Sequence, residues 1–390
     1  MLTAKRIIIF IGREDTMLGL YIHIPFCNNI CPYCDFYKMV ASNNLKNKYI
    51  DALLAEMKLK KLDNYKFDTL YIGGGTPTSL TLDQLERLFL YIKNNLNLDC
   101  LKEFTIEVNP GDLTSDLIDL FVKYGISRVS IGVQTFNPRL QEIIKRPFSF
   151  DELKAKIDTL KEKNINNINL DLIYSIPTET VEEFDQDLDK AISLDVTHLS
   201  VYSLILEEHT IFYHKYLKGE LELIDDKLES KMYHHLCNKL SQNNFIHYET
   251  SNFSKKGYQS FHNLIYWNCD EYLAVGASSA SYFSNYRNTN IRNIGKYIES
   301  INNGEIALSE SNYISKEEAM EEFIIFGLRK TKGISKNEFA LRFDEKIKDT
   351  YLSIQTLIDE GLLKENRNYI YIPQKYFYIS NHIIVKILSE

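Results

Sequence analysis

Cysteine is scarce in this chain, with six residues among 390. That content is far below a secreted disulfide scaffold, and a chain of this length can bury a substantial core without disulfides. No apolar run approaches the length of a membrane span. The chain also lacks an excess of basic residues, since its formal net charge is −8. This charge argues against a general nucleic-acid-binding protein. These absences favour a cytoplasmic protein with no intrinsic membrane span and no nucleic-acid partner.

The first 16 residues, MLTAKRIIIFIGREDT, carry a short apolar run behind two basic residues. A signal peptide has a similar pattern, but this run is short and no small-residue cleavage site follows it, so we reject that interpretation. The first predicted strand begins directly after Met17. We therefore expect Met17 to be the natural start and residues 1–16 to be an N-terminal appendage without function.

Short β-rich runs alternate with amphipathic helical stretches from residue 18 to about residue 205. The predicted strands are 20–24, 69–74, 103–108, 127–133, 167–173 and 198–204, and the clearest helices are 44–62, 81–96, 115–125 and 180–194. This alternation is typical of βαβ units in a parallel sheet. Six units predict an α/β fold that forms a partial (β/α)6 barrel, with its chemistry at the carboxyl ends of the strands.

The pattern becomes irregular beyond about residue 210. We expect a core over residues 17–240, a connecting region over 241–311 and a small C-terminal domain over 312–390. The last of these reads as helices followed by a glycine and a β-wing, which predicts an α+β, winged-helix-like domain.

Half of the cysteines lie within eight positions, in the stretch CNNICPYC. Cys27, Cys31 and Cys34 have the spacing C-x3-C-x2-C, so one tight loop can present three thiolates to three corners of an iron–sulfur cluster and leave the fourth iron open. The alternative is tetrahedral zinc held by the same cysteines and His23. The remaining cysteines are isolated and are expected to be buried small hydrophobes: Cys100, Cys237 and Cys269.

Polar residues and glycines follow the predicted strands. YIGGGTPT places Gly74, Gly75 and Thr76 at the end of the second strand, where glycine lets backbone groups approach a ligand closely. Glu107 lies in an otherwise apolar strand, and a charge there is costly unless it faces a partner. The later strands add Gln134 and Asp171, and Arg146 follows twelve residues after Gln134. For each of these residues alone, a structural hydrogen bond is an equally good interpretation.

The cysteine spacing after the first strand of a partial α/β barrel resembles the radical S-adenosylmethionine superfamily. The flanking phrase YIHIPFC is similar to its oxygen-independent coproporphyrinogen III oxidase (HemN) family, and the resemblance runs from residue 19 nearly to the C-terminus. It implies that the three cysteines hold a 4Fe–4S cluster, that S-adenosylmethionine chelates the fourth iron, that an electron donor serves the cluster, and that the C-terminal domain is of the HemN type. The residues implied to contact S-adenosylmethionine are Tyr21, Tyr33, Gly74, Gly75, Thr76, Glu107, Gln134, Arg146 and Asp171.

Two loops depart from the pattern of that family. The family usually has DLIYGLPGQT after the fifth strand, whereas this chain has DLIYSIPTET, with Ser175 and Thr178 at the glycine positions. The family usually has LGRxH after Gln134, whereas this chain has IKRPF, with Pro147 after Arg146. The geometry of both loops is therefore open at this point.

Two features separate branches of the family. The oxidase has a fourth cysteine two positions after the third, where this chain has Phe36, and it has a longer N-terminal extension. HNLIYW (262–267) instead resembles a haem-chaperone branch, which implies haem and haem-accepting client proteins as partners. The main alternatives are the decarboxylating oxidase itself and a zinc-binding module without redox chemistry; a homodimer is a further option.

Within HNLIYW, His262 offers an imidazole for haem iron, and Tyr266 and Trp267 offer flat faces for a porphyrin. The structural alternative is that His262 caps a turn and Trp267 fills a domain interface. Other histidines are open as ligands: His209, His214, His234 and His235.

Overall fold

The computed structural model describes residues 16–389. The appendage predicted over residues 1–16 therefore lies outside the described residues, apart from Thr16. The proposed start at Met17 is not tested by the structure.

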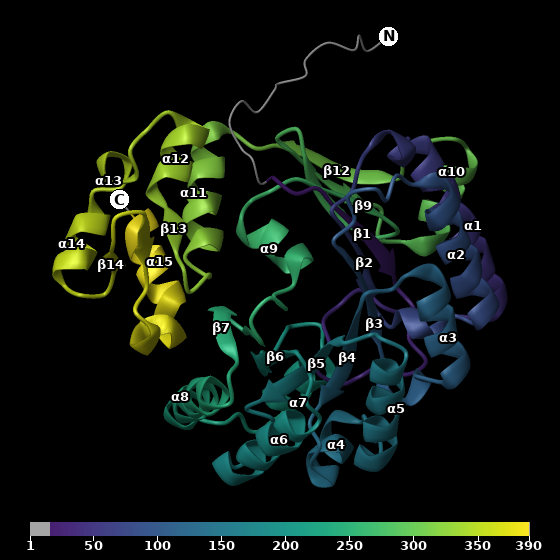
Figure 1. Cartoon of the computed structure of the whole chain (residues 1–390), viewed down its shortest axis with the longest axis horizontal. Helices are drawn as coiled ribbons and strands as arrows, with labels where there is room; N and C mark the ends of the chain where they lie inside the picture. Colours follow the sequence, from purple (N-terminus) through teal and green to yellow (C-terminus); the bar gives the residue numbers. More distant parts are fainter. Residues whose placement is uncertain (1–15, 390) are drawn as a thin grey trace.

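Six parallel strands form the first half of the fold, which confirms the predicted partial barrel. They are β1 (Gly19–Ile24), β2 (Thr69–Gly74), β3 (Glu103–Val108), β4 (Arg128–Gln134), β5 (Asn167–Tyr174) and β6 (His198–Ser203). Apolar residues alternate with buried polar ones along these strands, and helices cover the outer face of the sheet (Figure 1). The helices of this half are α1 (Asn43–Leu59), α2 (Leu82–Asn95), α3 (Ser115–Tyr124), α4 (Pro138–Ile144), α5 (Phe150–Glu162), α6 (Val181–Ser193), α7 (Ile211–Leu217) and α8 (Asp226–Gln242).

The sequence beyond α8 extends the same sheet at both edges. Its elements are β7 (Ile246–Glu249), β8 (Asn252–Ser254), α9 (Phe261–Trp267), β9 (Tyr272–Val275), β10 (Ala280–Phe283), β11 (Tyr286–Asn290), α10 (Ile294–Asn302) and β12 (Leu308–Tyr313). The twelve strands have the order β12-β11-β10-β9-β1-β2-β3-β4-β5-β6-β8-β7. β9 pairs in parallel with β1, and β8 pairs antiparallel with β6. The region expected to connect two domains thus contributes strands to both sides of the core, and the predicted domain limits stay a prediction.

Helix α9 lies between the curved sheet and the C-terminal domain (Figure 1). Its N-terminus is held by Glu103 at the start of β3, whose carboxylate accepts from the backbone N–H groups of Phe261 at 2.8 Å and His262 at 3.3 Å. Ser260 caps the helix and also donates its hydroxyl to Glu103 at 3.2 Å. An anionic group at a helix N-terminus is favourable, so a buried carboxylate fixes the HNLIYW segment against the barrel.

The C-terminal domain is a group of helices with a small antiparallel sheet in the order β13-β15-β14, as predicted. It contains α11 (Lys316–Gly327), β13 (Ile334–Ser335), α12 (Lys336–Phe343), α13 (Ile347–Thr350), α14 (Ser353–Asp359), β14 (Lys364–Glu365), β15 (Tyr369–Tyr371) and α15 (Ser380–Leu388). Trp267 at the end of α9 packs beside Phe326 of α11, with ring centroids 6.2 Å apart. No helix among residues 16–389 combines the length and apolar character needed to cross a bilayer.

One fully buried carboxylate joins four elements on the β1 side of the sheet. Glu56 of α1 accepts from the backbone N–H of Gly276 at 2.7 Å, the amide of Asn290 at 2.6 Å and the hydroxyl of Tyr297 at 2.6 Å. Lys60, one turn later in α1, lies 2.7 Å from the same carboxylate. Because every partner donates to a charged group, this carboxylate links α1 to the loop after β9, to β11 and to α10.

Candidate functional site

The three clustered cysteines lie on one loop that hangs from the carboxyl end of β1. The loop is closed at its base, where Cys27 N–H donates to Met39 O at 3.0 Å and Met39 N–H donates to Pro25 O at 2.8 Å. Lys38 adds a second closure by donating to Cys34 O at 2.6 Å. Cys27 is buried, whereas Cys31 and Cys34 are partly exposed. The loop therefore presents its thiols from a fixed frame.

The glycine run after β2 packs against this loop. Gly75 has no room for a side chain, because a Cβ there would lie 2.7 Å from Phe26 O and 3.0 Å from Cys27 Sγ. Gly74 has a φ of +120°, which side-chain-bearing residues rarely adopt. Thr76 N–H donates to Phe26 O at 2.7 Å, and its hydroxyl lies 3.6 Å from Cys27 Sγ. The glycines thus bring β2 and the cysteine loop into direct contact, a role additional to the ligand binding that we predicted.

A cavity of about 400 Å³ opens beside the cysteine loop at the carboxyl ends of the strands; we call it the cluster-side cavity. Of the residues predicted to contact S-adenosylmethionine, all except Tyr21 line it: Tyr33, Gly74, Gly75, Thr76, Glu107, Gln134, Arg146 and Asp171. The structure thus brings together residues from β2, β3, β4, β5 and the cysteine loop. Their role as ligands stays a prediction.

Glu107 is a half-buried carboxylate in this wall. Tyr71 OH donates to one of its oxygens at 2.8 Å, and Gly74 N–H donates to the other at 3.0 Å. Burial raises the pKa of Glu107 to about 7. Burial also raises the pKa of Asp171, which accepts from Ser130 at 3.1 Å and Asn169 at 2.8 Å. Both carboxyl groups line the cavity and accept hydrogen bonds from neutral donors.

Gln134, the last residue of β4, and Arg146, after α4, both line the cavity. Gln134 has a φ of 70°, at a point where the pairing of β4 with β5 shifts register. Such an irregularity re-aims a side chain, and it is common beside functional sites. Arg146 donates to Asn109 Oδ1 at 2.6 Å and to Tyr33 OH at 3.4 Å. Although Pro147 departs from the family pattern, Arg146 still lies against the cysteine loop.

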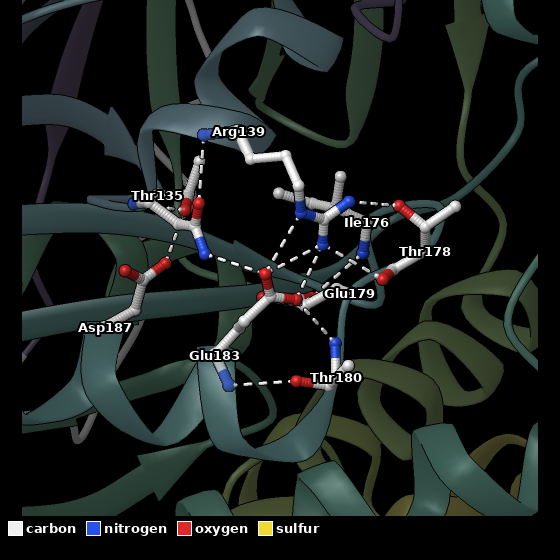
Figure 2. A network of polar contacts seen from close by, with 9 residues as sticks. Thr135, Arg139, Ile176, Thr178, Glu179, Thr180, Glu183 and Asp187 are labelled. Atoms are coloured by element: carbon white, nitrogen blue, oxygen red, sulfur yellow. Dashed lines mark hydrogen bonds and ion pairs between the residues drawn. The ribbon is translucent and has the colours of Figure 1, made fainter.

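Figure 2 shows a polar network that ties the segment after β4 to the loop after β5. Asp187 of α6 accepts from the Thr135 hydroxyl and from Phe136 N–H, at 3.0 Å for the latter. Arg139 donates to Thr178 Oγ1 at 2.6 Å and forms an ion pair of 2.6 Å with Glu183. These contacts fix the two loops that border Gln134.

The two residues that replace family glycines adopt left-handed backbone. Ser175 has a φ of 64° and Thr178 a φ of 71°, in the region where glycine is unstrained. The departure therefore changes the residue types and keeps a conformation suited to glycine. The Arg139 contacts to the Thr178 side chain and carbonyl hold this conformation in place.

Glu179 in the same network yields a pH prediction. It is 2% exposed, one of its oxygens has no partner among the described residues, and burial raises its pKa to about 8. The native chain therefore keeps a proton that the unfolded chain loses near the ordinary value of 4.5, so stability falls as the pH rises between these two values. We expect Glu179→Gln to gain stability over the wild type by up to ~1.4 kcal/mol per pH unit between about pH 5 and about pH 8, measured by urea unfolding.

The exposed Glu182, in the first turn of α6 three residues after Glu179, supplies the control. Glu182→Gln should reproduce the wild-type change of stability with pH. A Glu179→Gln profile parallel to that of the wild type over this range would contradict the buried, protonated state of Glu179.

The chemistry of the donor set fits a polynuclear cluster better than a single ion. Among residues 16–389, no three His, Cys, Asp or Glu side chains lie together so that they could hold one metal ion. His23, the fourth ligand of the zinc alternative, has Nδ1 2.9 Å from Tyr21 OH and Nε2 3.3 Å from Tyr37 O. Three thiols spread along one loop suit a cluster in which each cysteine holds a different iron. This geometry disfavours the zinc interpretation.

A second cavity, of about 470 Å³, is lined by residues of β1, the cysteine loop, α9 and β9; we call it the seam cavity. Its lining includes Tyr21, Tyr266 and His209, and it shares Asp35 and Phe36 with the cluster-side cavity. Tyr21 therefore lines the seam cavity and not the cluster-side cavity, although its ring centroid lies 6.0 Å from that of Tyr71, which lines the latter.

The HNLIYW residues are mostly engaged within the protein. His262 is 1% exposed, with Nδ1 2.7 Å from Thr69 Oγ1 and Nε2 2.8 Å from Tyr266 OH. Burial lowers the pKa of His262 to about 3, so its ring is neutral and both nitrogens have partners. Haem ligation by His262 is untested, and this geometry speaks against it. Trp267 packs on the C-terminal domain, which agrees with the structural alternative.

Sequence reasoning missed several residues of the site. Tyr71 and Asn109 orient Glu107 and Arg146, and Tyr202 adds a ring to the wall of the cluster-side cavity. Tyr71 lies on the same face of β2 as Thr69 and Gly73, alternating with the apolar Leu70 and Ile72, a signal that was available; Asn109 follows β3 directly, in the Asn-Pro pair. The expectation that all three isolated cysteines are buried is wrong for two of them. Cys237 is buried, but Cys269 is half-buried and Cys100 is exposed.

Comparison with known proteins agrees with this geometry. The sequence model of the Radical SAM superfamily matches residues 21–191, and that of the HemN C-terminal domain matches residues 314–375. The structure superposes on coproporphyrinogen III oxidase (HemN) from Escherichia coli with a TM-score of 0.83 and 21% identity, over 97% of this chain and 91% of that one. Heme chaperone HemW of Lactococcus lactis is 36% identical over 95% of this chain and 97% of its own length. Heme chaperone HemW of Bacillus subtilis is 35% identical over 96% of this chain and 100% of its own length.

The fold and the cysteine loop define a radical S-adenosylmethionine protein, which implies a 4Fe–4S cluster and S-adenosylmethionine as its groups. Within that superfamily, the chain belongs to the HemW family of haem chaperones. The resemblance drawn from YIHIPFC and HNLIYW is thereby confirmed.

Proposed function

We propose that this protein binds haem and delivers it to haem-requiring proteins, including those of respiration, while Cys27, Cys31 and Cys34 carry a 4Fe–4S cluster. S-adenosylmethionine would occupy the cluster-side cavity, next to the open iron. When bound, the cluster supplies an electron for cleavage of the sulfonium. Client proteins that accept haem and an electron donor for the cluster are the partners this function requires.

The observation that carries the proposal is the match to HemW proteins along nearly the whole chain, from the cysteine loop to the C-terminal domain. Two features of the site support it. The cysteine loop after β1 packs against the glycine run at the end of β2, and the polar ends of β3, β4 and β5 converge on the adjoining cavity. Phe36, where the oxidase has a further cysteine, is 71% exposed and lines both cavities.

A paired assay on one anaerobically reconstituted sample tests the proposal. We expect about one haem per chain in a haemin titration. We expect no conversion of coproporphyrinogen III in the presence of S-adenosylmethionine and a strong reductant. Turnover to protoporphyrinogen would instead establish the decarboxylating oxidase, and absence of haemin binding would overturn the chaperone.

A further inference from the structure

The seam cavity has the walls expected of a site for a flat macrocycle. Its lining is rich in aromatic rings: Tyr21, Phe36, Tyr37, Tyr266 and Tyr272. These rings come from β1, the cysteine loop, α9 and β9. Aromatic faces supply large rigid contact area to a planar ligand, and a tyrosine ring also offers a polar edge. The HNLIYW segment contributes to this wall through Tyr266.

The cavity also holds a cation suited to a carboxylate ligand. Arg292, after β11, lies over the ring of Tyr37 with its guanidinium carbon 5.0 Å from the ring centroid. No carboxylate among residues 16–389 forms an ion pair with Arg292. Asp35 is the carboxylate among the lining residues, on the rim shared with the cluster-side cavity. A guanidinium held on an aromatic face and without an internal partner can pair with an acid group of a ligand.

A haem iron also needs a ligand, and imidazole is the usual one. The chain has nine histidines, all among the described residues, and two of them, His23 and His209, line the seam cavity. Both ring nitrogens of His23 are engaged by Tyr21 and Tyr37. His209 lies exposed on the loop between β6 and α7, and its ring makes no hydrogen bond to another residue of the described chain. His209 is therefore the imidazole with both access to the cavity and free nitrogens.

We infer that the seam cavity is the haem-docking site, with His209 as the axial ligand and Arg292 as the partner of a propionate. The inference rests on the proposed function and deepens it by assigning the site. The seam cavity shares Asp35 and Phe36 with the cluster-side cavity, so haem in this site would lie next to the cysteine loop. The proposal assigns the iron ligand to His209, on a loop that solvent can reach. His262 instead holds α9 against β2 inside the barrel.

The test is a haemin titration of the full-length, anaerobically reconstituted chain, followed by difference absorbance and electron paramagnetic resonance. We expect His209→Ala to weaken haemin binding about tenfold and to shift the Soret band, with added imidazole restoring the band position. His382→Ala is the matched control, because His382 is exposed on α15 and lines neither cavity. That variant should match the wild type.

A second pair of variants tests the acid contact. Arg292→Ala should weaken haemin binding about fivefold but leave binding of haemin dimethyl ester unchanged, because the ester carries no propionate charge. Arg292→Lys should restore part of the loss. If the wild type binds haemin while His209→Ala and Arg292→Ala bind it equally well, the docking site is wrong and the proposed function stands. If the wild type does not bind haemin, the proposed function itself fails.

Discussion

Replacing Cys31 with alanine is expected to reduce the iron content of the anaerobically reconstituted protein from about four atoms per chain to fewer than one. The cysteine loop offers three thiols, and the other cysteines lie elsewhere: Cys100 after α2, Cys237 in α8 and Cys269 after α9. With only two thiolates, two of the four irons lack a protein ligand, and solvent can reach both. Iron and sulfide analysis, with the visible absorbance of the cluster, measures the effect.

Cys100→Ala is the control for this experiment. Cys100 is exposed and lines neither of the two cavities beside the cysteine loop. It should retain the wild-type iron content. Wild-type iron in the Cys31→Ala variant would rule out the cysteine loop as the cluster holder.

The second large effect is structural. We expect Glu56→Ala to lower the free energy of unfolding by about 4 kcal/mol, because it leaves a backbone N–H, an amide and a hydroxyl buried without their acceptor. Lys60 loses its ion-pair partner at the same time. Urea unfolding followed by circular dichroism gives the value.

Asp51→Ala provides the comparison on the same helix. Asp51 pairs with Arg87 at the surface, where an ion pair contributes less than about 1 kcal/mol. A Glu56→Ala variant as stable as Asp51→Ala would show that the Glu56 contacts do not hold the β1 edge of the sheet together.

The sequence was sufficient for the parts of the fold that depend on local patterning. β2 and β3 begin and end where their apolar runs predict, and α2 and α6 begin at threonines that form capping boxes with Gln84 and Glu183. The polar strand-end residues were also predictable, because carboxyl ends of parallel strands meet at one edge. The cluster-side cavity gathers them as expected.

Contacts across long sequence separations could not be predicted in the same way. No local pattern indicates that Glu103 caps α9, more than 150 residues later, or that Tyr272 pairs beside Gly19. The surroundings of His262 could not be predicted for the same reason, since its imidazole contacts Thr69 of β2, far away in the sequence. His209 carried no distinguishing signal in the sequence, because only the folded loop brings it to a cavity.

The pairing of β1 with β9 also constrains how the protein matures at the ribosome. Gly19 emerges early, whereas its partner Tyr272 follows some 250 residues later, an interval of tens of seconds at about 5–20 residues per second. Until then β1 has an open edge, which is the part of a nascent sheet most prone to pair wrongly. The cysteine loop follows β1 directly. The strand that supports this loop is therefore paired on both sides, and ready for delivery of iron and sulfide, only after residue 275 has been translated.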